Sequence, residues 1–132
     1  MGDTLSINKA RAFLLFCAIG LVPIALGYGA KPTVSLDQLF GITVDTINLT
    51  HIMRAVMGLY FGMIVIWVWG AFSEQLTTPA LVSCAVFMLG LAAGRLLSFV
   101  LDGMPHWLLV VYALLEVLLG LIAIILYRQR ST

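Results

Sequence analysis

Four long apolar runs decide what this chain can fold into. The chain has 132 residues, of which 62% are hydrophobic and only 10% are charged. Soluble domains carry about 25% charged residues. A membrane-spanning helix needs about 20 apolar residues, and helices satisfy their backbone polar groups inside lipid. We therefore predict a single all-α transmembrane domain, an antiparallel four-helix bundle with spans over about 12–29, 49–72, 79–101 and 107–127.

The positive charges near the ends of these runs predict the orientation. Lys9 and Arg11 precede the first run, and Arg128 and Arg130 follow the last one. The two loops at the opposite end offer only Lys31. Because cytoplasmic segments carry an excess of Lys and Arg, we expect a multi-pass protein with both termini in the cytoplasm.

The long loop at 32–48 contains the signals of a short helix. Ser35 and Gln38 have the spacing of a capping box, and Gly41 can end a helical turn. The segment between them contains Leu36, Leu39 and Phe40. We predict a short interfacial helix on the outer surface that acts as a lid. The alternative is a loop that dips its apolar residues into the headgroups.

Two further boundaries have recognisable residues. Thr77 or Thr78 can cap the third long helix, which places Pro79 at its first position. The sequence DGMP at 102–105 is typical of a tight turn, because Gly and Pro favour the backbone angles of turns. This turn predicts that the third and fourth long helices lie side by side.

Two opposite charges lie inside apolar runs. A charge such as Arg95 or Glu116 at that depth costs at least about 2.5–3.5 kcal/mol, so it faces the protein interior and has a partner. At a rise of about 1.5 Å per residue, Arg95 lies roughly 10 Å and Glu116 roughly 13 Å below the outer ends of their helices. We predict that they face each other in the outer half of the bilayer, beside a blind pocket that opens outward.

Helical spacing assigns further polar residues to the same faces. Residues three or four apart share a helix face, which relates Ser98 and Asp102 to Arg95, and Tyr112 to Glu116. The predicted ligand site or buried charge cluster comprises Arg54, Arg95, Ser98, Asp102, Tyr112 and Glu116. Small residues four apart let helices approach closely. The glycines predicted to pack helices are Gly58, Gly62, Gly90, Gly94 and Gly120.

The charge balance leaves two interpretations of this cluster open. Arg54 and Arg95 against Glu116 give an excess positive charge, which Asp102 or Asp45 partly balances. One interpretation is a non-catalytic site that binds the anionic or strongly polar head of a small amphiphile, a lipid headgroup or a quinone-like ligand. The other is an internal ion pair that fixes helix register.

Three function classes follow from these interpretations. The leading hypothesis is a non-catalytic binding protein for a small amphiphilic ligand, and the second is an accessory or assembly subunit of a larger membrane complex. The expected partners are membrane lipid, such a ligand, and a membrane-complex partner or a second copy in a homo-oligomer. The third is an enzyme or a proton-coupled transporter that uses Glu116 as its titrating group. A net charge of +1 gives no reason to expect a nucleic-acid partner.

Other candidate chemistry is weak. His51 and His106 lack the clustered carboxylates or cysteines of a metal site, so we predict no metal and no cofactor. Cys17 and Cys84 form no CxxC motif, and we expect them to be small buried packing residues.

The motifs resemble those of a known family. Small four-span bacterial membrane proteins of a domain of unknown function have a signature similar to GRLLS at 94–98, DGMP at 102–105 and Glu116. Their second motif is similar to Asn48, Arg54, Gly58 and Tyr60. The layout is DoxX-like, and DoxX-like proteins are often linked to membrane redox or quinone-associated complexes. The resemblance implies a bacterial inner-membrane protein with motif residues Arg54, Arg95, Asp102 and Glu116.

The orientation leads to a labelling prediction. In a variant without Cys17 and Cys84, a cysteine introduced next to Ser35 should react with a membrane-impermeant maleimide on intact cells. A cysteine introduced next to Gln75 should react only after the cells are opened, because the Lys and Arg distribution places it inside. The reverse labelling pattern would show that both termini lie outside the cytoplasm.

Overall fold

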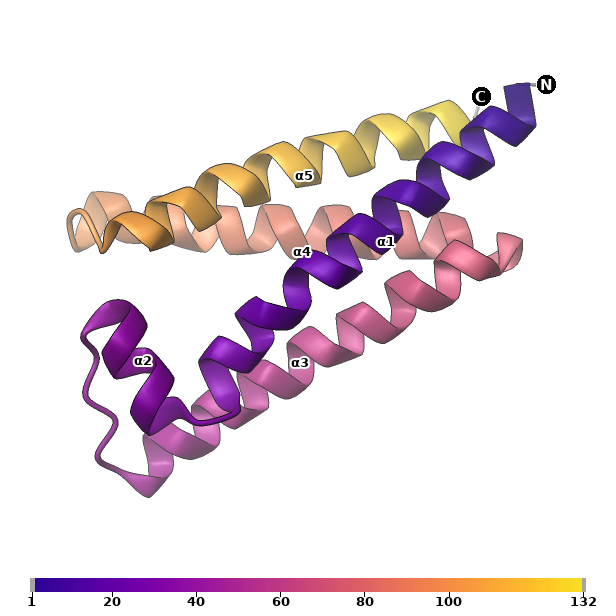
Figure 1. The fold of residues 1–132 in the computed structure, drawn as a ribbon. Helices are drawn as coiled ribbons and strands as arrows, with labels where there is room; N and C mark the ends of the chain where they lie inside the picture. Colours follow the sequence, from indigo (N-terminus) through magenta and orange to yellow (C-terminus); the bar gives the residue numbers. More distant parts are fainter. Residues whose placement is uncertain (1, 132) are drawn as a thin grey trace.

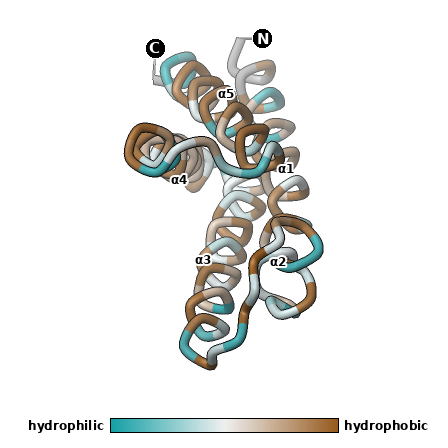
Figure 2. Tube along the Cα trace, turned by 90° about the vertical axis from the view of Figure 1, so that its left-hand side faces the viewer, coloured by the Kyte–Doolittle hydropathy of each residue, from teal (hydrophilic) through white to brown (hydrophobic). Residues whose placement is uncertain are grey.

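Helices make up nearly all of residues 2–131, which are the residues that the computed structural model of the chain describes (Figure 1). They are α1 (Gly2–Gly29), α2 (Pro32–Phe40), α3 (Ile47–Phe72), α4 (Glu74–Leu101) and α5 (Trp107–Ser131). Four of them, α1, α3, α4 and α5, are long and apolar enough to cross a membrane (Figure 2). The predicted bundle of four transmembrane helices with a short additional helix is confirmed.

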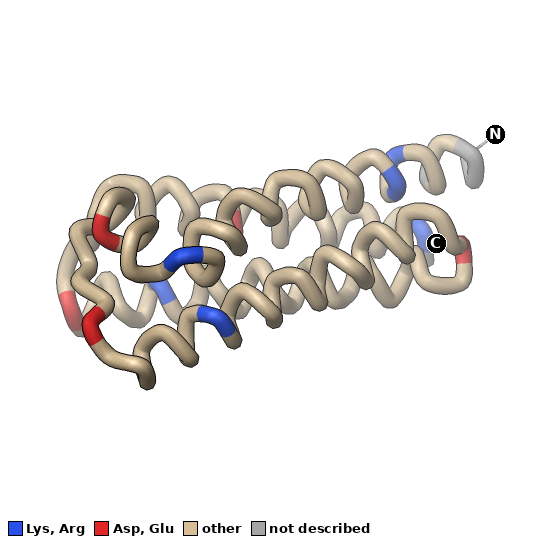
Figure 3. Tube along the Cα trace, turned by 60° about the horizontal axis from the view of Figure 1, so that its bottom comes forward, with Lys and Arg blue, Asp and Glu red and all other residues tan. Residues whose placement is uncertain are grey.

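The long helices pack in two pairs. α1 lies along α3, α4 lies along α5, and contacts between α3 and α4 join the pairs. Both ends of the chain lie at one end of the bundle, called here the terminal end, and α2 and the α4–α5 turn lie at the other, the loop end (Figure 1). Charged residues gather toward these two ends and are sparse between them (Figure 3). This distribution suits a bundle whose middle lies in lipid.

The start of α4 differs from the prediction. α4 begins at Glu74, with Ser73 as its N-cap residue, so only Ser73 separates it from α3. Pro79 lies inside the helix, where it removes one backbone hydrogen bond without setting the start. Thr77 does not cap the helix: its hydroxyl donates to the carbonyls of Gly70, at 2.7 Å, and Ser73, at 3.0 Å. Residues 74–78, which lie between the second and third predicted spans, are therefore helical, and Ser73 alone links α3 to α4.

The short helix in the long loop is present, but its first turn differs from the prediction. α2 begins at Pro32, whose fixed φ angle suits the first turn of a helix. Ser35 lies inside α2 and donates its hydroxyl to the carbonyl of Gly27 at 2.6 Å, so the expected capping box is wrong. Gly41 ends the helix with a φ of 67°, as its position predicts. Leu36 is buried and ties α2 to the bundle.

The apolar core lies in the half of the bundle nearer the terminal end. Trp67 is fully buried there and donates its indole N–H to the hydroxyl of Ser83 at 3.2 Å. Leu14 of α1 and Leu81 of α4 are also fully buried. Cys17 and Cys84 are free and buried in the same cluster, which confirms the predicted burial. The half nearer the loop end has less apolar packing and contains the polar cluster.

Most of the glycines predicted to pack helices make no close helix contact within the bundle. Four of the five glycines are exposed, and a Cβ atom added to any of them would meet no atom within 4 Å: Gly58, Gly62, Gly90 and Gly94. Their spacing correctly placed each pair on one helix face, but it could not say whether that face meets a helix or lipid. Gly120 does pack as predicted, with Leu89 of α4 only 2.6 Å from its added Cβ. Gly29 and Gly70, which the spacing did not single out, also make close contacts.

Gly70 and Gly62 form a matched test of this packing. A Cβ on Gly70 would collide with the Cβ of Ala80 and lie 2.9 Å from the carbonyl oxygen of Leu76. Gly70→Ala should therefore lower the free energy of unfolding by about 1–3 kcal/mol, because backbone must shift. Gly62→Ala should leave it unchanged or raise it by up to about 1 kcal/mol through helix propensity. Thermal unfolding in detergent measures both, and equal losses would contradict the packing described.

Candidate functional site

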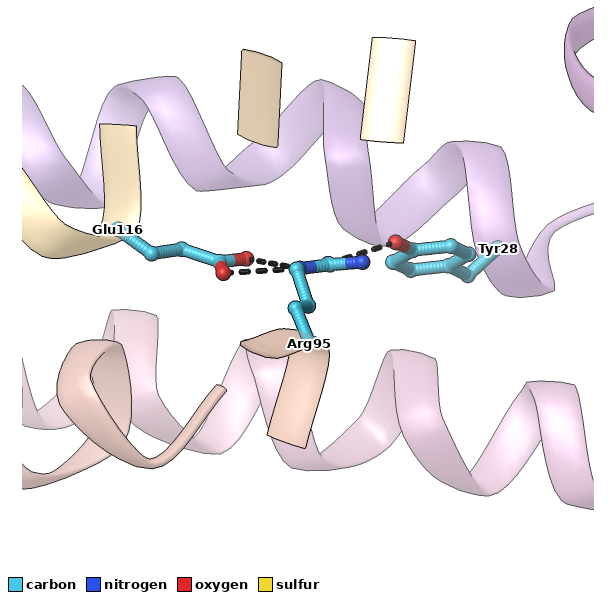
Figure 4. A network of polar contacts seen from close by, with 3 residues as sticks. All are labelled: Tyr28, Arg95 and Glu116. Atoms are coloured by element: carbon cyan, nitrogen blue, oxygen red, sulfur yellow. Dashed lines mark hydrogen bonds and ion pairs between the residues drawn. The ribbon is translucent and has the colours of Figure 1, made fainter. Parts of the chain in front are cut away.

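Arg95 of α4 and Glu116 of α5 form a buried ion pair (Figure 4). Nε of Arg95 donates to Oε2 of Glu116 at 2.8 Å and to Oε1 at 3.0 Å. The side chains are 18% and 9% exposed, respectively. Since water is nearly excluded, each charge depends on the other for stabilisation. The predicted pairing of these two residues across adjacent antiparallel helices is confirmed.

Tyr28 connects the ion pair to a third helix. Nη2 of Arg95 donates to the Tyr28 hydroxyl oxygen at 3.4 Å, so α1 contacts the cluster (Figure 4). The sequence did not reveal this contact, because an aromatic residue near a helix end is typical of the membrane interface. No helical spacing relates Tyr28 to Arg95, which lie 67 positions apart on different helices. The guanidinium thus joins α1, α4 and α5.

Aromatic rings cover the guanidinium on the side of the loop end. The Tyr112 ring centroid lies 5.8 Å from Cζ of Arg95, a cation–π distance. Phe40, at the end of α2, contacts the rings of Tyr28 and Tyr112, with 6.4 Å between the centroids in both cases. It also meets His106 edge-on at 5.8 Å. The last residue of α2 therefore covers the cluster at the loop end, which is the position expected of a lid.

Hydrogen-bonding capacity remains at the centre of the cluster. No acceptor among the side chains of residues 7–130 meets Nη1 of Arg95. Both oxygens of Glu116 receive the same N–H group, and a carboxylate has about four lone-pair sites. The pair is thus neutral as a unit and still has a donor and acceptors to offer.

Ser98 and Asp102 form a separate contact on the exposed end of α4. The Ser98 hydroxyl donates to Oδ2 of Asp102 at 2.7 Å, and the Asp102 N–H donates to the Ser98 carbonyl, also at 2.7 Å. Asp102 makes no ion pair with Arg95 in the described part of the chain. Ser98 and Arg95 do border the same open groove, which Gly90 and Gly94 also line. The predicted stripe is present, but its carboxylate is engaged at the helix end.

Arg54 lies apart from the buried pair. Its Nη1 donates to the carbonyls of Gly29, at 3.1 Å, and Ala30, at 3.2 Å, so it caps the end of α1. This position is favourable because the carbonyl end of a helix carries partial negative charge. Glu116 and Arg54 share no ion pair or hydrogen bond within residues 2–131. The expected excess positive charge beside Glu116 is therefore absent from the cluster.

An apolar cavity of about 130 Å³ adjoins Glu116. It lies among α1, α4 and α5, and Tyr60 of α3 closes one side. Its rim includes Phe16, which is 65% exposed, and Leu115, which is 44% exposed. Cys17 borders the cavity from α1. Because exposed side chains on α1 and α5 form its rim, the cavity opens sideways between these helices.

The comparisons with known proteins give a family and no function. Residues 9–127 match a family that is described as a domain of unknown function, DUF4345. The chain belongs to this family. No curated protein and no solved structure matches it.

Two other candidates from the DUF4345 sequence lie outside the ion-pair cluster or at its edge. His51 borders a groove beside the start of α3, and His106 stacks against Trp107 with 5.6 Å between the ring centroids. Among the side chains of residues 7–130, no three His, Cys, Asp or Glu residues come together as metal ligands. The charged chemistry of the interior is thus concentrated in Arg95 and Glu116.

The ion pair gives a prediction for this DUF4345 chain. Glu116→Gln and Arg95→Gln should each lower the free energy of unfolding by about 3–5 kcal/mol, because each leaves a buried charge without its partner. The double variant should lose clearly less than the sum, since it removes both charges. Chemical unfolding in detergent measures the cycle, with Ser98→Ala as a surface control within about 0.5 kcal/mol of the parent. Additive losses would show that the two residues are not coupled.

Proposed function

We propose that the cavity beside Glu116 binds a small amphiphile with a neutral, hydroxyl-bearing head. The observation that carries this proposal is the composition of the cavity wall: mostly apolar side chains, with Tyr60 and Tyr112, surround one carboxylate, and that carboxylate is already neutralised by Arg95. Small-molecule sites typically combine an apolar lining with a few convergent polar groups.

The charge of the cluster supports a neutral head over an anionic one. An anion in the cavity would lie beside Glu116, and Arg54, which sequence analysis assigned to the same cluster, caps α1 instead. A hydroxyl group donates to a free lone pair of the Glu116 carboxylate. Glu116 is the charged residue of the cavity lining, so the carboxylate is the group that a hydroxyl in the cavity would meet. A neutral hydroxyl thus complements this carboxylate without adding a charge to the cavity.

The size of the cavity limits how much of the ligand it holds. A volume of about 130 Å³ is slightly less than the roughly 150 Å³ of an engineered cavity that binds benzene. It therefore suits one ring or a short segment of chain. The remaining apolar body of the ligand stays in lipid, which it reaches through the opening between Phe16 and Leu115.

The membrane and the side of access are part of the proposal. The distribution of Lys and Arg favours a multi-pass protein with cytoplasmic termini. The resemblance in motifs supports a bacterial inner membrane. In this orientation the ligand enters from the outer leaflet, because the cluster lies nearer the loop end.

One observation favours a second candidate, an accessory subunit of a membrane complex. Gly58 and Gly62 on α3 and Gly90 and Gly94 on α4 are exposed small-residue pairs, which let another helix approach closely. An enzyme or a proton-coupled transporter that uses Glu116 has less support, because Glu116 is already paired with Arg95.

Photolabelling tests the binding proposal. Hexadecanol that carries a diazirine should label α1 and α5 peptides around Gly20 and Leu119, and unlabelled hexadecanol should compete. Hexadecanoic acid with the same diazirine, in its ionised form, should label these peptides less. Glu116→Gln should weaken competition about tenfold, because a hydrogen bond to a charged acceptor is lost. Stronger labelling by the acid would overturn the neutral-head proposal.

Two glycines supply a matched pair of controls. Gly20 borders the cavity and Gly62 does not, and neither would bring an added Cβ within 4 Å of another atom. Gly20→Phe should therefore fill the opening and abolish competition, whereas Gly62→Phe should leave labelling unchanged. If labelling survives Gly20→Phe and Gly62→Phe instead removes a co-purifying protein, the accessory-subunit proposal is favoured.

A further inference from the structure

A second hollow, of about 810 Å³, lies at the loop end beside the first turns of α3. It is far larger than the cavity beside Glu116, and polar side chains border much of it. Thr33 of α2 lies on one side, and the residues before and within α3 lie on the other. The polar residues of this second side include Asp45, Thr50, His51 and Arg54. We call this hollow the α2–α3 groove.

Charged groups in the α2–α3 groove have unused binding capacity. Arg54 donates to Gly29 and Ala30 through Nη1 alone, so Nε and Nη2 meet no acceptor among the side chains of residues 7–130. In the same described part of the chain, Asp45 and His51 make no ion pair and no side-chain hydrogen bond. All three side chains are exposed. The groove therefore presents a cation and an anion that the protein itself does not pair.

The order of these charges follows from the direction of α3. Asp45 precedes the helix, which begins at Ile47 and runs from the loop end into the apolar part of the bundle. Arg54 lies roughly 10 Å further along the helix axis. The cation is thus deeper in the membrane and the anion nearer the water, whichever side of the membrane the loop end faces.

This order matches one class of lipid headgroup. In a zwitterionic glycerophospholipid the phosphate is attached to glycerol, near the acyl chains, and the amine extends beyond it toward water. We infer that the α2–α3 groove binds a phosphoethanolamine headgroup, with the phosphate on Arg54 and His51 and the primary ammonium on Asp45. Arginine suits phosphate because its planar donors match the phosphate oxygens. A carboxylate suits a primary ammonium, which donates hydrogen bonds that a choline group lacks.

The surface below the groove is open to acyl chains. Ala55, Gly58 and Gly62 follow Arg54 toward the middle of α3, and all three are exposed. No atom would lie within 4 Å of a Cβ added to either glycine. A lipid whose headgroup occupies the groove can therefore lay a chain against α3 without displacing a side chain.

Native mass spectrometry of the delipidated full chain in detergent tests this inference. The probes are three phospholipids with the same short acyl chains and phosphoethanolamine, phosphocholine or phosphoglycerol headgroups. The phosphoethanolamine lipid should bind most tightly to the parent protein. Asp45→Asn should weaken its binding about fivefold, to the level of the phosphocholine lipid, since an exposed ion pair contributes little more. Binding of the phosphoglycerol lipid should not weaken.

Asp37→Asn is the matched control, because Asp37 is an exposed carboxylate on α2 that does not border the groove. It should leave all three affinities unchanged. Arg54→Gln should weaken all three lipids, although it also removes the cap of α1, so Asp45→Asn is the deciding variant. Unchanged phosphoethanolamine binding in Asp45→Asn would overturn the inference. Tightest binding of phosphoglycerol to the parent protein would also overturn it and would indicate a purely anionic lipid site.

Discussion

The ion pair between Arg95 and Glu116 is the constraint on which the arrangement of the long helices depends. An isolated charge in the hydrocarbon region costs at least about 2.5–3.5 kcal/mol, so neither residue can turn toward lipid without its partner. Because Glu116 receives Nε and Tyr28 receives Nη2, one guanidinium fixes the rotation of α5 and the end of α1 relative to α4. Apolar side chains alone would permit these helices to slide along each other at lower cost.

The same pair explains why the interior is open beside Glu116. It holds α5 against α4, while α1 lies along α3, and the fully buried Leu14, Trp67 and Leu81 close the interior nearer the terminal end. Toward the loop end, the guanidinium of Arg95 connects α1 and α5 through Tyr28 and Glu116. The cavity of about 130 Å³ lies at this change from apolar to polar packing. Aromatic contacts of Phe40 then shield the guanidinium from the aqueous end.

The sequence predicted those features that depend on one helix or on two neighbouring helices joined by a short turn. The four spans, the turn at 102–105 and the meeting of Arg95 with Glu116 belong to this group. Tyr28 could not be predicted, because its contact depends on how α1 leans across the bundle. The exposed Gly58 and Gly62 were misassigned for a related reason: helical period relates them to Arg54, and Arg54 does not face the interior. The period of a helix predicts which residues share a face. Which helix, or whether lipid, contacts that face depends on how the helices pack.

Charge balance across the depth of the membrane explains why the two arginines separate. With Arg54 beside Arg95 and Glu116, the buried cluster would have a net positive charge, and one carboxylate would not compensate the desolvation of two cations. Arg54 instead meets the carbonyls at the end of α1, where the helix dipole places partial negative charge. Its remaining donors stay near the interface, where water or headgroups can solvate them. The deep cluster is consequently neutral and the shallow groove keeps separated charges, so depth rather than residue type determines what each arginine can bind.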